Sequence, residues 1–308
     1  MNLIICCTPL QVLIAEKIID LYPENKFYGI LFDALDNKKF ELYGKRLKNK
    51  CHNFLIIGLN NTRLKKIKTI FSILKYKNQE FNKVFLASID KPLIHILLSN
   101  IKFKELYTFD DGTANITKTS FYYKEPENNI PRKLQFIQTI LGNKLDINKI
   151  KNISKLHYSI YPKKENIIDN IEYISLFEKE NTNPSRVENN IRILLGQPIF
   201  NDVDKNIQIV KRVFEKYNID YYFPHPRESY IVDNIPYIDT ELIFEDFYFK
   251  ESENKNIIIY TFFSGAVLNI VNKENINHIF SLKPKLEDEA YVDTYKILES
   301  FGIKIIEI

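Results

Sequence analysis

The sequence predicts an α/β protein made of two Rossmann-like domains that face a cleft. Its 308 residues are enough for two domains of ordinary size. Short apolar runs alternate with helix-like segments in the first half, and the alternation returns after a polar stretch. This alternation is typical of parallel sheets with helices on both faces. We expect one domain at 1–155, a connector at 156–190 and a second domain at 191–308.

The first domain is expected to begin with a buried strand at 2–7, because this run is almost continuously apolar. Thr8 suits the N-cap of the following helix, and Pro9 suits its first residue. Apolar residues at helical spacing then continue to Leu21. The other elements expected in this half are strands at 26–32, 52–59, 83–89 and 104–112 and helices at 37–49, 62–77, 91–101 and 134–142.

The second domain is expected to repeat this order after the polar segment 179–190. Ligands of parallel sheets bind beyond the carboxyl ends of the strands, so candidate site residues are sought at those ends. The expected order is a strand and turn at 191–198, a helix at 204–217, a strand and loop at 220–228, a helix at 240–249, a strand followed by a helix at 255–271, a strand at 276–284 and a helix at 287–301.

Composition and absent motifs exclude several classes of protein. With 45% hydrophobic and 27% charged residues, the chain has the balance of a soluble globular protein, and a net charge of +4 is too small to indicate nucleic-acid binding. The sequence lacks G-x-G-x-x-G, G-x-x-x-x-G-K-[ST], H-E-x-x-H and G-x-S-x-G, which argues against the dinucleotide, P-loop, zincin and serine-hydrolase classes. No signal peptide is visible, and no apolar run approaches the ~20 residues of a membrane span. We therefore expect a cytoplasmic protein.

An acidic pair, Asp110 and Asp111, stands directly before Gly112 at the end of an expected strand. Adjacent carboxylates on an extended chain point in different directions, so they do not chelate one ion together. We expect no metal here, with a magnesium ion shared with a phosphate as the alternative. In the simplest interpretation one aspartate caps a turn through Thr113 and Asn115, and the other is solvated.

His225 lies between Pro224 and Pro226 and is followed by Arg227. The prolines restrict the backbone on both sides, so they present the imidazole in a fixed direction at a strand end. A histidine beside a guanidinium suits a phosphate. The alternative is a rigid, solvated turn without a function.

Thr261, Ser264 and Gly265 follow an apolar strand and open an expected helix. Hydroxyls and free amides at a helix N-terminus form an anion site. The alternative is an ordinary N-cap, which is the commoner outcome for such residues.

Gly196 and Pro198 turn the chain out of another strand, and two acids, Asp202 and Asp204, follow. Either carboxylate is a candidate general base or helix N-cap. The N-cap role suits Asp204, because this residue directly precedes the expected helix. The isolated histidines are expected to be structural: His95, His157 and His278.

Three of these segments, "FDDGTANI", "FPHPRE" and "IYTFFSGA", together resemble the motif set of bacterial lipooligosaccharide sialyltransferases, glycosyltransferase family 52. The resemblance extends to "NLIICCTPLQVLIAEKI", "VFLASIDK" and "RILLGQP", so it spans nearly the whole chain in order. It implies a GT-B-like enzyme that moves sialic acid from CMP-sialic acid to a terminal galactose of lipooligosaccharide, α2,3 and with inversion. It also implies that the donor is the only small molecule needed, without a cofactor or metal. Asp110 and Asp111 are adjacent, so they do not form the metal-binding D-x-D of many glycosyltransferases.

The resemblance also implies roles for particular residues. It places His225 at the CMP phosphate as the acid, and it assigns Ser264 to the same phosphate. In the family pattern, the aspartate that acts as the base directly follows Gly-x-Pro, and this chain has Ile199 at that position. Asp202 is the nearest acid and the first candidate for the base, and Asp111 is the second. The residues expected to bind substrate are Asp110, Gly112, Gly196, Pro226, Arg227, Thr261, Ser264 and Gly265.

The resemblance further implies that 1–155 is the acceptor-side domain, that 191–308 binds the CMP sugar, and that the protein forms a homodimer. We expect no nucleic-acid partner. The basic helix 62–77 suits peripheral contact with the inner membrane as well as it suits a solvated surface. The alternatives to a sialyltransferase are a hexosyltransferase of the same family that uses another nucleotide sugar, and a non-catalytic glycan- or nucleotide-binding protein.

Overall fold

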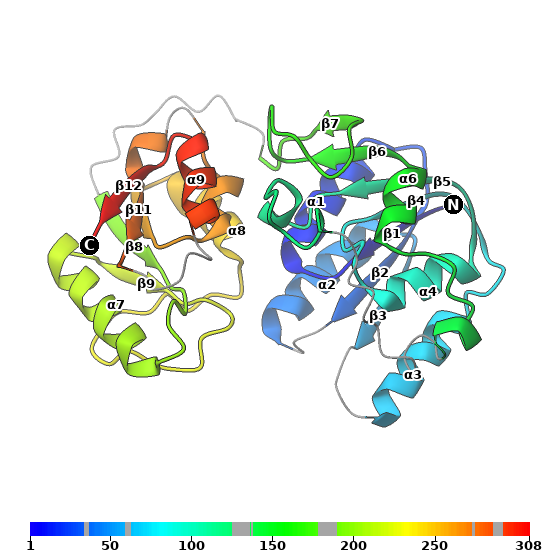
Figure 1. Ribbon diagram of the computed structural model, residues 1–308, viewed down its shortest axis with the longest axis horizontal. Coiled ribbons are helices and arrows are strands. Elements are labelled where there is room, and N and C mark those ends of the chain that lie inside the picture. The colour runs from blue at the N-terminus through cyan, green and yellow to red at the C-terminus, as the bar shows by residue number, and fades with distance from the viewer. Residues whose placement is uncertain are drawn as a thin grey trace. The chain divides into compact units, whose positions relative to one another are not determined.

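The chain divides into two units, residues 1–176 and 177–308, and each contains its own parallel β-sheet (Figure 1). This computed structural model describes residues 1–33, 37–58, 63–124, 136, 138–177, 190–272, 275–285 and 292–308, and for 63–68 it describes the backbone alone. Both sheets have the strand order of a doubly wound α/β domain. The predicted fold class of two Rossmann-like domains is confirmed.

Seven strands form the first sheet, in the order β3-β2-β1-β4-β5-β6-β7. β1 pairs directly with β4, and the strand order changes direction at this pair. Open α/β sheets bind ligands beyond the carboxyl ends of the strands at such a switch point. The strands are β1 (Asn2–Cys6), β2 (Phe27–Asp33), β3 (Asn53–Gly58), β4 (Glu80–Leu86), β5 (Lys102–Phe109), β6 (Ser154–Ser159) and β7 (Ile171–Tyr173).

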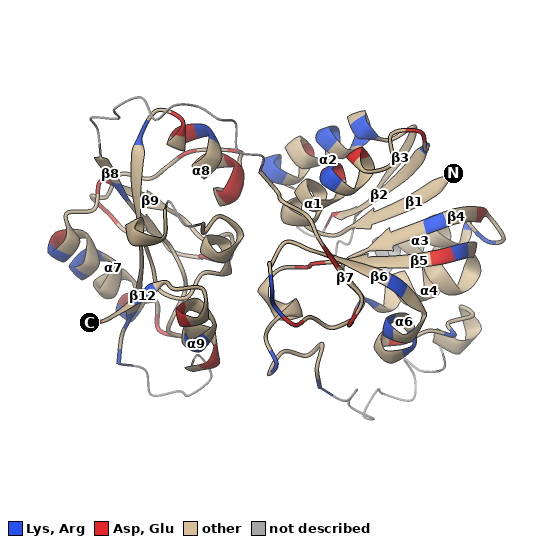
Figure 2. Ribbon diagram, turned by 90° about the horizontal axis from the view of Figure 1, so that it is seen from above, with Lys and Arg blue, Asp and Glu red and all other residues tan. Residues whose placement is uncertain are grey.

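Helices cover both faces of this sheet, with α1 and α2 on one face and α3 and α4 on the other (Figure 2). The first helix begins as the sequence predicts, because the Thr8 hydroxyl accepts a hydrogen bond from the Gln11 N–H (3.3 Å) and Pro9 is the first helical residue. The helices are α1 (Pro9–Asp20), α2 (Lys38–Lys50), α3 (Arg63–Leu74), α4 (Pro92–Asn100) and α6 (Ile147–Ile153).

The first unit ends later in the chain than the predicted first domain. β6 and β7 extend the first sheet beyond β5, so residues 156–176, predicted as part of a connector, lie in the first unit. β7 has three partly or fully exposed residues, and so short an edge strand has no apolar pattern that a sequence would reveal. Residues 136 and 138–140 of the predicted helix at 134–142 are helical, and most of the polar segment 179–190 lies outside the described residues.

Five parallel strands form the second sheet, in the order β12-β11-β10-β8-β9, which changes direction between β8 and β10. The predicted helix after β10 is a five-residue 3₁₀ helix, η2 (Gly265–Asn269), and β12 was not predicted. No helix among the described residues has the length and apolar character needed to cross a membrane. The elements are β8 (Asn190–Leu195), α7 (Val203–Tyr217), β9 (Tyr221–Phe223), α8 (Phe244–Ser252), β10 (Asn256–Thr261), β11 (Ile279–Lys283), α9 (Val292–Ser300) and β12 (Lys304–Glu307).

Candidate active site

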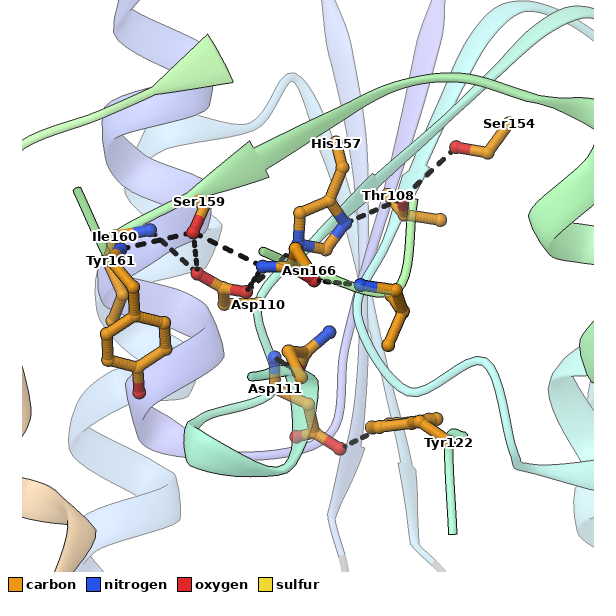
Figure 3. Close-up of polar contacts among 12 residues, drawn as sticks. Thr108, Asp110, Asp111, Tyr122, Ser154, His157, Ser159, Ile160, Tyr161 and Asn166 are labelled. Carbon is orange, nitrogen blue, oxygen red and sulfur yellow. Dashed lines mark hydrogen bonds and ion pairs between the residues drawn. The ribbon is translucent and has the colours of Figure 1, made fainter. Parts of the chain in front are cut away.

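Asp110, which directly follows β5, is completely buried and surrounded by hydrogen-bond donors (Figure 3). Its Oδ1 accepts hydrogen bonds from His157 Nε2 (2.9 Å) and Asn166 Nδ2 (2.8 Å). Its Oδ2 accepts them from Ser159 Oγ (2.8 Å) and the Ile160 N–H (2.7 Å). These donors belong to β6 and the segment after it, so the carboxylate joins that segment to the end of β5. The interpretation of a solvated aspartate is wrong for Asp110.

Asp111 points away from that network (Figure 3). Its Oδ2 accepts hydrogen bonds from Tyr122 Oη (2.8 Å) and Ser88 Oγ (3.4 Å), and its Oδ1 accepts one from Gln11 Nε2. The Asp111 N–H, and not its side chain, joins the following turn by donating to Asn115 Oδ1 (2.8 Å). Burial raises the pKa of the Asp111 carboxyl, although the hydrogen bonds from Tyr122 and Gln11 act to lower it. The group is therefore a stronger base than an ordinary aspartate.

Gly112 allows the sharp turn that separates the two carboxylates. Its φ of +118° lies in a region that residues with a side chain rarely adopt. The short 3₁₀ helix η1 (Thr113–Asn115) follows directly. A glycine is required here by the backbone, which accounts for its place in the motif.

The partners of Asp111 lie at the switch point of the first sheet. Gln11 follows β1 and Ser88 follows β4, the two strands between which the order changes direction. Gln11, Ser88 and Tyr122 were not predicted from the sequence as site residues. The sequence did hold one signal that could have identified Gln11. It is a polar residue on the buried face of α1, beside Val12 and Leu13.

His225 lies in the loop after β9 and is held by hydrogen bonds from within that loop. Its backbone N–H donates to Glu228 Oε1 (3.0 Å), and its ring Nδ1 accepts a hydrogen bond from the Arg227 N–H (3.1 Å). Because Nδ1 accepts, the neutral ring carries its hydrogen on Nε2. Burial, and then the Arg227 charge, lower the pKa of His225 to about 4. The imidazole is therefore neutral at pH 7 before any ligand binds.

Glu228, which was not predicted as a site residue, bonds this loop to Tyr222 of β9 and lies close to Gly196 after β8. Its Oε1 also accepts a hydrogen bond from Tyr222 Oη (2.9 Å), and burial raises the pKa of its carboxyl. A Cβ atom on Gly196 would lie 2.2 Å from Glu228 Oε1 and 2.4 Å from Tyr222 Oη. Gly196 is therefore needed because two side chains approach its backbone closely, and not because of its φ.

The turn after β10 is bonded to the turn after β8, across the switch point of the second sheet. Gln197 Oε1 accepts a hydrogen bond from the Phe263 N–H (3.0 Å), and Thr261 Oγ1 accepts one from the Ser264 N–H (3.2 Å). Ser264 Oγ accepts a hydrogen bond from the Ala266 N–H (3.3 Å), so Ser264 is an N-cap. The predicted regular helix is wrong here, because η2 is a 3₁₀ helix of five residues, too short to have a substantial dipole. The anion site at Thr261, Ser264 and Gly265 stays a prediction.

Asp202 is the exposed N-cap of α7, a role that was predicted for Asp204. Its Oδ1 accepts hydrogen bonds from the Asp204 N–H (2.9 Å) and the Lys205 N–H (3.3 Å). Asn206 Oδ1 holds the preceding segment by accepting from the Ile199 and Phe200 N–H groups, both at 2.9 Å. The position of Asp202 is thus fixed, while its surroundings are polar and open.

The predicted residues fall into two groups, one in each unit. Pro226 and Arg227 are exposed, and Gly265 is half-buried at the start of η2. None of the described residues forms a group of three His, Cys, Asp or Glu side chains that would hold a metal ion. The first group is Asp110, Asp111 and Gly112, and the second is Gly196, Asp202, His225, Pro226, Arg227, Thr261, Ser264 and Gly265.

The chain is similar to known proteins over its whole length. It is 42% identical over 311 residues to a Pasteurella multocida protein named CMP-N-acetylneuraminate:beta-galactoside alpha-2,3-sialyltransferase, covering 100% of this chain and 99% of that one. It is 40% identical to the Haemophilus influenzae N-acetyllactosaminide alpha-2,3-sialyltransferase, with 90% of each chain covered.

Comparison with solved structures supports the fold. Arabidopsis thaliana UGT89C1, solved with quercetin, matches with a TM-score of 0.54 at 10% sequence identity, covering 100% of this chain and 85% of that one. Its fold is the GT-B fold, which agrees with two Rossmann-like units.

The family model described as glycosyltransferase family 52 matches residues 24–286. The chain is therefore a glycosyltransferase, and it belongs to glycosyltransferase family 52.

Proposed function

We propose that this protein transfers sialic acid from CMP-sialic acid to the terminal galactose of a β-galactoside, forming an α2,3 linkage with inversion. The observation that carries the proposal is the 42% identity, over the whole chain, to the Pasteurella multocida enzyme whose name states this donor, acceptor and linkage. We further propose that the natural acceptor is a galactose-ended lipooligosaccharide, and that the protein acts as a homodimer in the cytoplasm in peripheral contact with the inner membrane.

In this proposal the second unit binds CMP-sialic acid. Departure of CMP leaves negative charge on the phosphate, and the Nε2–H of neutral His225 donates a hydrogen bond to it. Ser264 lies in the turn that Gln197 bonds to the end of β8, and its hydroxyl binds the same phosphate. The pKa of His225 is about 4 before a ligand binds. A bound phosphate favours the protonated ring and so raises this pKa, which prepares His225 to act as an acid.

The base in this proposal is Asp111, with Asp202 as the second candidate. A base must take the proton of the acceptor hydroxyl, and a raised pKa brings a carboxyl closer to that task. Burial raises the pKa of Asp111, which also lies at the switch point of its sheet. Asp202 is exposed and already caps α7.

We propose that the reaction needs no metal ion. The leaving group is a nucleoside monophosphate and not a pyrophosphate, so a metal that bridges two phosphates is less necessary. Adjacent acids such as Asp110 and Asp111 suit chelation poorly, and the Asp110 oxygens already accept hydrogen bonds from Asn166 and Ser159, among others.

The test is a transfer assay with purified protein, CMP-sialic acid and a galactose-terminated acceptor, with and without EDTA. NMR of the product would establish the linkage and the anomeric configuration. Thermal shifts with CMP, UDP and ADP sugars identify the nucleotide. A shift with a UDP or ADP sugar and none with CMP would make the protein a hexosyltransferase, and CMP binding without transfer would make it a non-catalytic binding protein.

A further inference from the structure

Gln11 in the first turn of α1 connects the ends of three strands through its side chain. The residue is completely buried. Its Oε1 accepts a hydrogen bond from the Cys7 N–H (2.6 Å), which fixes the orientation of the amide, because only the oxygen can accept. Nε2 must then face the neighbouring strand ends, where it donates to Ser88 Oγ (2.9 Å) and to Asp111 Oδ1.

The Asp111 carboxylate is held on both oxygens. Among the residues that the structure describes, three donors contact it: Gln11 on Oδ1, and Tyr122 and Ser88 on Oδ2. An ionised carboxylate offers about four acceptor positions, two on each oxygen. One acceptor position on Oδ1 is therefore left for a further donor. The hydrogen bond from the Gln11 amide to the same oxygen sets the direction of that position.

We propose that Gln11 is a positioning residue that aims Oδ1 of Asp111 at the acceptor hydroxyl, with Tyr122 fixing the other oxygen. The inference rests on the proposed function, in which Asp111 is the base. In the transfer step the acceptor O–H bond breaks and its proton moves to Oδ1. The acceptor oxygen bonds to the anomeric carbon, and the bond from that carbon to the phosphate oxygen breaks, with its electron pair leaving on CMP.

The charges around Asp111 make these two donors important. Burial raises the pKa of the Asp111 carboxyl, and the hydrogen bonds from Tyr122 and Gln11 are the largest effects that lower it. Asp90 raises this pKa and Lys91 lowers it, so the two partly offset each other. Burial raises the pKa of Cys7 to about 12, which keeps that thiol neutral. The titratable groups that face Asp111 are Cys7, Asp90, Lys91 and Tyr122.

The test measures the transfer rate against pH for Gln11→Met and Tyr122→Phe. Each variant removes a donor to the carboxylate, so the ionised form of Asp111 is less stable and the acidic limb of the rate profile moves to higher pH. We expect kcat at pH 6 to fall about tenfold, because both the ionised fraction and the alignment of the base are lost. The KM for CMP-sialic acid should not change.

Two matched controls separate positioning from stability. Asn2→Leu removes a buried amide from the opposite end of β1, where it bonds to Asn25 Oδ1 (3.1 Å). Tyr76→Phe removes a hydroxyl that bonds to Tyr28 Oη (2.7 Å), away from Asp111. Both should lower the Tm without moving the pH profile.

The Asp111→Asn variant tests whether Asp111 is the base, and so separates that assignment from the positioning role of Gln11 and Tyr122. If this variant keeps its activity, Asp111 is not the base and the inference fails with that assignment. If it is folded and inactive while Gln11→Met and Tyr122→Phe keep the normal profile and kcat, Asp111 stands as the base and the positioning role alone is wrong. Should Gln11→Met fail to fold, Tyr122→Phe tests the positioning role by the same measurement.

Discussion

At the scale of single residues, the loop after β9 sets the tautomer and the orientation of the His225 ring. The Arg227 N–H occupies Nδ1 and the Glu228 carboxylate holds the backbone, so the Nε2–H is presented in one direction. We expect His225→Ala to lower kcat at least ~100-fold, as is typical when a group that stabilises developing charge is removed. Steady-state kinetics would measure this, and near-normal turnover in a folded variant would remove His225 from the mechanism.

The low pKa of His225 also predicts how stability depends on pH. The ring takes up a proton at about pH 4 in the folded protein and near its ordinary pKa of about 6.5 in the unfolded chain. Between these values the unfolded state binds more protons, so this contribution to stability is present above pH 6.5 and is lost as the pH falls toward 4.

Urea unfolding of the wild type and of His225→Asn between pH 4 and pH 7 would measure this contribution. The free energy of unfolding of the variant should fall less steeply as the pH is lowered. A parallel fall in both proteins would contradict the assigned pKa. His52→Asn, at an exposed position, is the matched control for the substitution itself.

Asp202 has a structural role that can be separated from catalysis. Asparagine caps a helix about as well as aspartate, whereas alanine costs about 1 kcal/mol. Asp202→Asn should therefore keep the stability of the protein, while Asp202→Ala should lose about 1 kcal/mol in denaturant unfolding. If Asp111 is the base, both variants should retain transfer activity. Loss of activity in a fully stable Asp202→Asn would make Asp202 the base instead.

At the scale of elements, the turn after β8 depends on a close approach. Gly196→Ala would place a Cβ atom 2.2 Å from Glu228 Oε1, so the Glu228 carboxylate would have to move away from the His225 N–H. Overpacking of this kind costs about 1–3 kcal/mol. Gly58→Ala is the matched control, because nothing lies within 4 Å of a Cβ there.

We expect Gly196→Ala to lower both the Tm and kcat, since the loop that holds His225 is displaced. Thermal unfolding and steady-state kinetics would measure the two effects, with Gly58→Ala losing neither activity nor much stability. A Gly196→Ala variant with normal turnover would show that the loop tolerates the displacement.

At the scale of the whole molecule, the two sheets predict where each substrate acts. Ligands of parallel sheets bind at the switch point, which lies between β1 and β4 in the first unit and between β8 and β10 in the second. We expect CMP to slow amide hydrogen exchange in 196–202, 224–228 and 261–265, and the acceptor glycan to slow it in 87–91 and 110–116. Hydrogen-exchange mass spectrometry of the full chain would measure this, and protection by CMP in the first unit would contradict the assignment.

Features that depend on neighbouring residues could be predicted from the sequence alone. Alternating apolar runs and helical spacing predicted most strands and helices of both sheets, and Thr8 and Pro9 fixed the start of α1. His225 was identified because its two flanking prolines restrict the backbone locally. The family was also recognisable, because its motifs are short and keep their order along the chain.

Which side chains meet became clear only from the three-dimensional fold. Asp110 and Asp111 are adjacent in the chain, yet one bonds to His157 on β6 and the other to Gln11 on α1. Contacts between residues so far apart depend on the order of the strands in the sheet, which no local pattern encodes. For the same reason the sequence marked Gly196 as a turn residue, whereas the fold shows that it makes room for Glu228.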